Sequence, residues 1–384
     1  MQQPDRFERI SLDNVPSPCY IIDELALEKN CKILGEVQKR TGCKILLALK
    51  GFSVFSMFPM IRKYLHGTCA SGLYEARLGK EKFGKEVHVF APAYDDREFS
   101  QLLKISDHIV FNSIGQWERL RPLVEKSRRK ISCGIRVNPE YSEIKLDIWN
   151  ACARYGRFGV KASDFHSVPE GIEGLHFHAL CEQNSDTLER VLAVIEKKFG
   201  NHLSKVKWVN FGGGHHITRP DYDIDRLCRI ITDFRRKYNV DVYMEPGEAV
   251  GLNGGIFLAR VLDIVRNEVE IAILDTSAWA HIPDILAASF RPDIIGGGKP
   301  GELKHIYRLA SRSCMSGDII GDYSFSRRLH RGSNIMFSDM AKYSVVSNNI
   351  FNGIPLPSIA VLTKSNKIRI LRKSGYEDYV ERLS

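Results

Sequence analysis

A lysine at the end of an apolar run is the first residue that could carry chemistry. The run Lys44–Lys50 reads Lys-Ile-Leu-Leu-Ala-Leu-Lys and stops at Gly51. It predicts a buried strand of a parallel sheet, because both faces of such a strand are covered. Lys50 then lies at the carboxyl end of the strand, where α/β enzymes place their catalytic loops. Its amine could attack a carbonyl, although a lysine that caps the strand and reaches into water is the alternative.

A glycine triplet is the second candidate. Gly212, Gly213 and Gly214 directly follow the apolar run 206–211. Three consecutive glycines free backbone N–H groups to surround an anion, and the loops after the last two strands of a (β/α)8 barrel commonly bind phosphate. Elsewhere such a triplet is usually a turn, but at this position it predicts a phosphate site.

Two glutamates flank a turn after the run 240–245. Glu245 closes the run and Glu248 follows Pro246 and Gly247. One interpretation is a strand end with two solvated carboxylates. The other is that Glu245 points into the barrel mouth and keeps a cationic heterocycle protonated, because a nearby negative charge raises the pKa of a cationic nitrogen acid.

Two histidines, His176 and His178, are two positions apart on one predicted strand and share a face. Such a pair can bind a metal, which keeps a metal-dependent hydrolase as an alternative. The neighbouring strand ends carry Lys50, Asn112 and Asn138, which suit a divalent metal poorly. We expect one histidine to stack on a flat ring and the other to pack inside the barrel.

A cysteine in a loop completes the reactive residues. Cys314 is followed by Gly317 and Asp318. A single cysteine is usually a small apolar residue of the core, but in a loop beside glycine and aspartate it could donate a proton.

Composition indicates an ordinary globular protein. The 384 residues are 43% hydrophobic and 26% charged, and 55 Lys and Arg against 46 Asp and Glu give a net charge of +9. The excess is thinly spread, so we expect no nucleic-acid partner. Nine cysteines without a Cys-x-x-Cys pair favour reduced thiols in the cytoplasm. No apolar stretch is long enough for export or membrane spanning, so we expect neither.

The elements that must position these residues form two sets. Eight short β-type runs lie between Lys44 and Glu245, mostly separated by segments long enough for a helix. This predicts an α/β fold, a (β/α)8 TIM barrel over 23–252. After Gly251 the runs alternate without helices, which predicts an antiparallel β-barrel or sandwich of residues 1–22 and 253–384, joined by a strand near Tyr20.

Taken together, these pieces resemble the fold-type III pyridoxal-phosphate decarboxylases, and most closely the carboxynorspermidine/carboxyspermidine decarboxylases of bacterial polyamine synthesis. The resemblance covers nearly the whole chain. It rests on the order and spacing of Leu47-Ala48-Leu49-Lys50, Ser71-Gly72-Leu73-Tyr74-Glu75, Phe158-Gly159, His178, Gly212-Gly213-Gly214, Glu245-Pro246-Gly247-Glu248, Ala280-His281 through Asp284, Cys314 with Gly317-Asp318, and Tyr343 followed by Phe351-Asn352-Gly353.

The resemblance implies a role for each residue. Lys50 would hold pyridoxal 5'-phosphate covalently, His178 would stack on its ring and Glu245 would pair with the pyridine nitrogen. The glycine triplet and Tyr343 would hold the phosphate. Family members are typically homodimers, in which the Cys314 segment of one subunit completes the site of the other.

Two departures from the ornithine and diaminopimelate relatives bear on the substrate. Those enzymes carry arginine where this chain has Glu248, and an acidic residue where it has Met315. Because a carboxylate would repel the phosphate, we expect Glu248, with Asp284 and Asp318, to bind the amines of a carboxylated polyamine. The expected reaction is decarboxylation of carboxynorspermidine and/or carboxyspermidine, with another basic amino acid (diaminopimelate, ornithine or lysine) as the alternative substrate.

Overall fold

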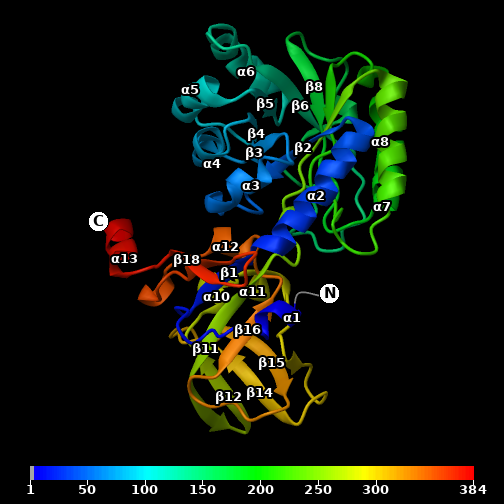
Figure 1. Cartoon of the computed structure of the whole chain (residues 1–384). Helices are drawn as coiled ribbons and strands as arrows, with labels where there is room; N and C mark the ends of the chain where they lie inside the picture. The colour runs from blue at the N-terminus through cyan, green and yellow to red at the C-terminus, as the bar shows by residue number, and fades with distance from the viewer. Residues whose placement is uncertain (1–3) are drawn as a thin grey trace. The chain divides into compact units, whose positions relative to one another are not determined.

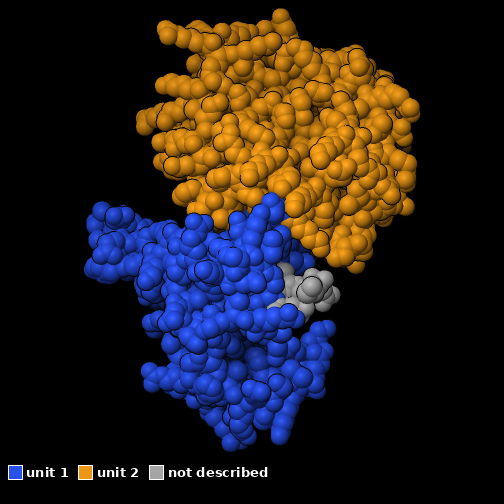
Figure 2. Space-filling view, viewed as in Figure 1, with its two compact units in different colours: residues 1–28, 251–384 blue, residues 29–250 orange. Residues whose placement is uncertain are grey.

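The computed structural model describes residues 4–384, which divide into two compact units. The barrel unit is Lys29–Val250, and the β unit combines Met1–Glu28 with Gly251–Ser384 (Figure 2). The first division falls inside a helix, α2 (Glu24–Thr41), and the second falls inside α9 (Glu248–Gly251).

Eight parallel strands close the barrel unit, as the eight apolar runs predicted. They are β2 (Lys44–Ala48), β3 (Gly67–Ala70), β4 (Glu86–Phe90), β5 (His108–Phe111), β6 (Ser132–Asn138), β8 (Ile172–His176), β9 (Trp208–Asn210) and β10 (Asp241–Met244). Pairing of β10 with β2 and of β5 with β6 completes the ring. A two-residue strand, β7 (Val160–Lys161), adds to β6. Every carboxyl end of the closed ring therefore faces one mouth.

Helices connect most of the strands. They are α3 (Phe58–Ile61), α4 (Leu73–Leu78), α5 (Asp96–Ile105), α6 (Ile114–Glu125), α7 (Ser185–Leu203) and α8 (Ile224–Tyr238). Side-chain caps mark several starts: Asp95 accepts the N–H groups of Arg97 and Glu98, and Asp223 accepts that of Arg226. Helices α7 and α8 lie side by side outside the strands (Figure 1).

A tryptophan fills part of the barrel interior. Trp208 packs with Leu46, Val110 and Tyr243 in one buried cluster. A Cβ atom built on Gly174 would lie 2.1 Å from the Trp208 ring, and one on Gly134 would lie 2.4 Å from it. Because any side chain at these two positions would collide with the indole, the strands carry glycine there.

The β unit is a mixed, antiparallel-rich sheet. Its strands are β1 (Cys19–Asp23), β11 (Gly255–Asn267), β12 (Val269–Leu274), β13 (Gly297–Gly298), β14 (His305–Ala310), β15 (Ile319–Phe325), β16 (Asn334–Ser338), β17 (Ser358–Leu362) and β18 (Ile368–Arg372). Strand β1 pairs with β11 and β17, so the N-terminal strand joins this sheet as expected. The predicted antiparallel β domain is confirmed, and two of its pairings, β1–β17 and β12–β14, are parallel.

Short helices complete the β unit: α1 (Pro4–Phe7), α10 (Ala278–His281), α11 (Asp284–Ala288), α12 (Ser344–Ser347) and α13 (Tyr376–Leu383). Two buried apolar clusters hold the sheet, one around Tyr20 and Phe257 and the other around Ile21 and Leu258. Within residues 4–384, no helix has the length and hydropathy needed to cross a membrane.

Candidate active site

Lys50 follows β2 in a tight turn at the barrel mouth. The strand ends at Ala48, and the Gly51 N–H donates to the Ala48 carbonyl at 3.0 Å. A Cβ atom on Gly51 would lie 2.9 Å from the backbone of Gly247, so the Lys50 turn packs against the turn that follows Glu245. The Lys50 side chain is exposed. An amine reachable from outside is therefore held beside the end of β10.

The charge of Lys50 acts on buried groups at the barrel mouth. Burial is the main cause that lowers the pKa of His178, and the Lys50 ammonium is the second. Burial is the main cause that raises the pKa of Cys69; the Glu245 charge raises it further, and the Lys50 charge lowers it. The Lys50 charge thus acts on groups at the ends of two other strands, β3 and β8.

His178 contacts the glycine triplet directly. Its Nδ1 accepts the Gly213 N–H at 3.0 Å. Gly212 and Gly214 have φ angles of +68° and +81°, which side chains rarely adopt. A Cβ atom on Gly214 would also lie 1.9 Å from the Leu180 carbonyl oxygen. The triplet therefore needs glycine both for its backbone conformation and for its close packing against the His178 loop.

Glu245 lies in the mouth with two polar partners. Its Oε2 lies 3.4 Å from His176 Nε2, and its Oε1 accepts the Asn210 amide at 2.7 Å. Burial opposes ionisation of Glu245, but His176 and Asn210 outweigh it and hold its pKa below the ordinary value. Burial lowers the pKa of His176, which favours a neutral imidazole that donates to the carboxylate. A carboxylate is thus available to a cationic ring nitrogen.

The two histidines differ in their surroundings. His176 is 1% exposed and stacks on Phe90, with ring centroids 5.5 Å apart. His178 is partly exposed at the mouth. His176 is therefore the packed histidine, and the stacking of His178 on a cofactor ring stays a prediction.

Sequence reasoning missed two polar residues of this site. Asn210 bridges Glu245 and the triplet, because its Oδ1 also accepts the Gly212 N–H at 2.8 Å. Arg136 is 5% exposed, lies over the rings of Phe90 and Phe158, and donates to the His178 carbonyl at 3.4 Å. A charged residue inside the apolar run 133–138 was the signal that could have identified Arg136.

Glu248 begins α9 beside a histidine. Its Oε1 lies 3.7 Å from His216 Nε2, and the Glu248 side chain is 11% exposed. Single ligand atoms of Glu182, His216 and Glu248 all lie within 4.8 Å of one another. The predicted role of Glu248 in substrate binding stays a prediction.

The other predicted site residues belong to the β unit. Cys314 is exposed, and its N–H donates to Asn352 Oδ1 at 2.8 Å. This bond joins the Cys314 segment to the segment Phe351-Asn352-Gly353. Asp284 begins α11, and Tyr343 has a positive φ of 39°. Whether Cys314, Asp284 and Tyr343 act beside Lys50 stays a prediction.

Asp318 is bound by its own unit. It is 2% exposed and accepts hydrogen bonds from the Ser277 hydroxyl (2.6 Å), the Trp279 N–H (3.0 Å) and the Ser311 hydroxyl (2.8 Å). These contacts indicate that Asp318 fixes the loop that carries Cys314. Its predicted substrate contact stays a prediction, and this geometry does not favour it.

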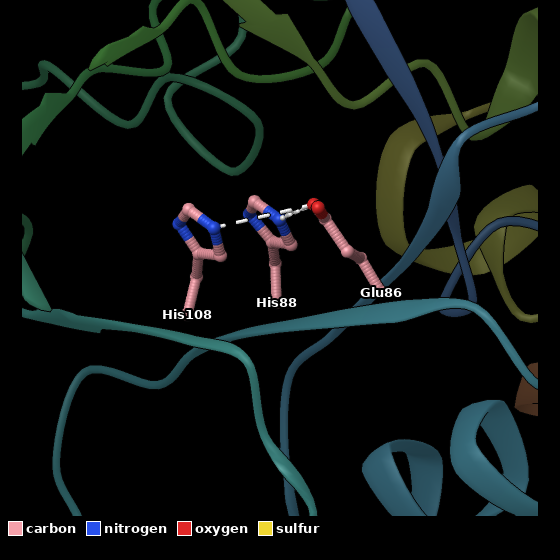
Figure 3. Close-up of side chains that lie close together, drawn as sticks. All are labelled: Glu86, His88 and His108. Atoms are coloured by element: carbon pink, nitrogen blue, oxygen red, sulfur yellow. Dashed lines mark hydrogen bonds and ion pairs between the residues drawn. The ribbon is translucent and has the colours of Figure 1, made fainter. Parts of the chain in front are cut away.

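A histidine cluster occupies the opposite end of the barrel. Glu86 and His108 begin β4 and β5, so they lie at the amino ends of the strands, with His88 beside them (Figure 3). His88 Nε2 lies 3.1 Å from Glu86 Oε2, and the His88 and His108 rings stack at 3.9 Å. These three residues could hold a metal ion. They lie at the end remote from Lys50, so they do not supply the metal site that the hydrolase alternative placed at His176 and His178.

Comparison with known proteins identifies the family. A carboxynorspermidine/carboxyspermidine decarboxylase of Campylobacter jejuni is 41% identical over 379 residues, which cover 96% of this chain and 98% of the relative. The chain belongs to the carboxynorspermidine/carboxyspermidine decarboxylase family. It is therefore an enzyme, and the family predicted from the motifs is confirmed.

A solved structure and a second relative are also similar to this chain. The crystal structure of the Campylobacter jejuni carboxynorspermidine decarboxylase complexed with norspermidine has a TM-score of 0.89, with 41% identity over 96% of this chain and 100% of that one. A carboxyaminopropylagmatine decarboxylase of Synechocystis is 40% identical over 379 residues, covering 98% of this chain and 97% of the relative. No model of a protein family matched the chain.

The residues of the barrel mouth fit the pyridoxal phosphate that this family of decarboxylases implies. Lys50 offers an amine, Glu245 offers a carboxylate, and the triplet offers the Gly214 N–H, because the Gly212 and Gly213 N–H groups already donate to Asn210 and His178. An aldehyde, a pyridine nitrogen and a phosphate would each meet a complementary group at the same end of the barrel.

Proposed function

We propose that this enzyme removes the α-carboxylate of carboxynorspermidine and/or carboxyspermidine, with pyridoxal phosphate bound at Lys50, and produces norspermidine or spermidine. The observation that carries the proposal is the convergence at one barrel mouth of Lys50, His178, the glycine triplet and Glu245. The 41% identity to an enzyme of this name supports the same substrate class.

When bound, the cofactor supplies an electron sink for the carbanion left by loss of CO2. The side chains of the chain supply charge and orientation. Glu245 holds a proton on the pyridine nitrogen, and Asn210 and His176 keep its carboxylate in place. His178 covers the ring while its Nδ1 accepts the Gly213 N–H. Cys314 is the proposed donor of the proton that replaces the carboxylate on the α-carbon.

Acidic side chains would select the cationic substrate. Glu248 with Asp284 would accept hydrogen bonds from the ammonium groups of the polyamine tail, each worth about 1.5–3 kcal/mol. A second candidate substrate is carboxyaminopropylagmatine, after which the Synechocystis relative is named. This compound ends in a guanidinium group. A planar guanidinium favours two parallel hydrogen bonds to one carboxylate, whereas an ammonium donates hydrogen bonds to acceptors in several directions.

We also propose that the protein acts in the cytoplasm as a homodimer in which Cys314 completes the partner's site. An exposed cysteine in a loop held by Asp318 is consistent with such a shared arrangement. Mixing inactive Lys50→Ala and Cys314→Ala chains, after unfolding and refolding together, should restore activity that neither variant has alone. No restored activity, with dimers present, would contradict the sharing.

The decisive experiment is CO2 release by the purified enzyme with a panel of substrates. Carboxynorspermidine and carboxyspermidine are expected to be turned over with kcat/KM well above those for diaminopimelate, ornithine and lysine. Carboxyaminopropylagmatine tests the guanidinium candidate in the same assay. A preference for diaminopimelate would overturn the proposed substrate class, and a colourless protein that loses activity to chelators would overturn the cofactor.

A further inference from the structure

His216 is a buried imidazole whose ring nitrogens lack a hydrogen-bond partner among the described residues. It stands two residues after Gly214 and is 6% exposed. Neither Nδ1 nor Nε2 makes a hydrogen bond with any residue in the described range 4–384. Leaving a buried polar group unpaired is unfavourable, so the ring is expected to bind a group that the chain itself does not supply.

Backbone contacts fix the position of His216 beside the triplet. Its N–H donates to the Gln183 carbonyl at 3.2 Å, and the Gln183 N–H donates to the Gly214 carbonyl at 3.1 Å. Two residues later, the Thr218 hydroxyl donates to the Ala249 carbonyl at 2.6 Å. The segment is thus attached to the His178 loop on one side and to the start of α9 on the other.

The charges nearby give His216 a specific task. The Gly212 and Gly213 N–H groups already donate to Asn210 and His178, so the triplet leaves a phosphate the Gly214 N–H. The Glu248 carboxylate, which faces His216, would repel a dianion. His216 Nε2 faces the Glu248 carboxylate at 3.7 Å, which leaves the other ring nitrogen for a different acceptor. A neutral imidazole carries one N–H, so pairing with Glu248 and donation to the phosphate together require the imidazolium, in which both ring nitrogens are donors.

We propose that the His216 imidazole donates a hydrogen bond to the phosphate of the cofactor, beside the glycine triplet. This inference rests on the proposed function, because that function supplies the phosphate. It also gives Glu248 and His216 separate tasks, with the carboxylate directed to the cationic substrate and the imidazole to the anion.

The test compares two aldehydes that differ only in the phosphate. Protein stripped of cofactor is titrated with pyridoxal phosphate and with pyridoxal, and the absorbance of the lysine-bound aldehyde is followed. His216→Phe is expected to weaken the binding of pyridoxal phosphate about 10- to 100-fold, because one hydrogen bond to a charged group is lost. The affinity for pyridoxal should be unchanged. His216→Asn, which keeps an N–H donor, should recover part of the loss.

Glu248→Gln is the matched control, because it changes the nearest carboxylate while keeping the imidazole. This variant should not weaken the binding of pyridoxal phosphate. Equal weakening of both aldehydes by His216→Phe, with an unchanged circular dichroism spectrum, would overturn the proposal. The proposal would also be overturned if His216→Phe left the affinity for both aldehydes unchanged but raised the KM for the polyamine. Loss of a bound divalent metal from the variant would overturn it too, since either result would make Glu182, His216 and Glu248 a cation site.

A second probe separates this inference from the proposed function. If the wild-type protein binds neither aldehyde, the proposed function fails. Inorganic phosphate is then titrated into wild-type protein and His216→Phe by calorimetry. Weaker phosphate binding by the variant would support the anion-binding role of His216, and equal binding or none would overturn it.

Discussion

The Nε2 atom of His176 lies 3.4 Å from Oε2 of Glu245 inside the barrel mouth. The two residues come from β8 and from the end of β10, and Asn210 of β9 binds the other carboxylate oxygen at 2.7 Å. Three neighbouring strands therefore hold one carboxylate in place. A carboxylate held this rigidly is what stabilisation of a protonated ring nitrogen requires, because it needs no reorganisation during the reaction.

Glu245→Gln tests this relationship. Removing the charge while keeping the shape should lower kcat about 100- to 1,000-fold, the effect of losing one electrostatic stabiliser, because the ring nitrogen loses its negative partner. Steady-state kinetics measures the change, and the visible absorbance serves as the control that cofactor is still bound. An unchanged kcat would show that Glu245 does not face the ring.

Lys50→Ala tests the covalent attachment. Without the amine, both turnover and the visible absorbance of the lysine-bound cofactor should disappear. Absorption spectra of the purified wild-type and variant proteins measure this directly. Lys44→Ala is a suitable control, because Lys44 begins the same strand and bonds to Asp241 and Tyr243 instead. A Lys50→Ala protein that stays coloured would contradict the assignment.

Glu248→Gln tests substrate selection. The KM for the polyamine substrate should rise about tenfold or more, since one charge-assisted hydrogen bond is weakened. Binding of pyridoxal phosphate should stay intact. Equal loss of substrate and cofactor binding would place the carboxylate near the cofactor instead of the substrate tail.

Asp318→Asn tests the role assigned to the buried carboxylate of the β unit. An amide in its place would point N–H donors at groups that already donate, namely Ser277, Trp279 and Ser311. The free energy of unfolding should fall by about 1–3 kcal/mol in urea denaturation. Cys314→Ala changes the exposed cysteine of the same loop and should leave stability unchanged. Equal stability of both variants would show that Asp318 does not fix the loop.

The histidine cluster at the amino ends of the strands should make stability depend on pH. Burial lowers the pKa of His108 from 6.5 to about 2. Below pH 6.5 the unfolded chain binds a proton at His108 that the folded chain does not. The contribution of His108 to the free energy of unfolding is therefore complete above this pH and is lost as pH falls. The loss per pH unit is at most about 1.4 kcal/mol for this one group.

His108→Phe isolates that contribution. The phenyl ring keeps the stacking on His88 but cannot titrate. Urea midpoints between pH 7.5 and 5 should fall less steeply for the variant than for the wild type. Glu86, whose pKa is lowered despite burial because His66 and His88 bond to it, titrates at lower pH and leaves this comparison unaffected. Parallel curves for the two proteins would mean that His108 does not contribute.

Local patterns were sufficient for most of the fold. The apolar run ending at Lys50 and the seven runs after it became the barrel strands, with bounds that differ by at most two residues. Patterns were weaker in the β unit at His305–Ala310 and Ile319–Phe325, which form β14 and β15. Their polar residues break the apolar run, so only pairing with neighbouring strands makes them part of the sheet.

The sequence by itself determined which chemical groups stand at the strand ends: the amine of Lys50, the glycine triplet and the carboxylates of Glu245 and Glu248. It did so because strand direction and side-chain period are local properties. Only the tertiary structure decided that His176 and Asn210 hold Glu245, that Asp318 is buried among its own loops, and that His216 faces Glu248. Those contacts join residues far apart in sequence, and their distances depend on how the strands close into a ring.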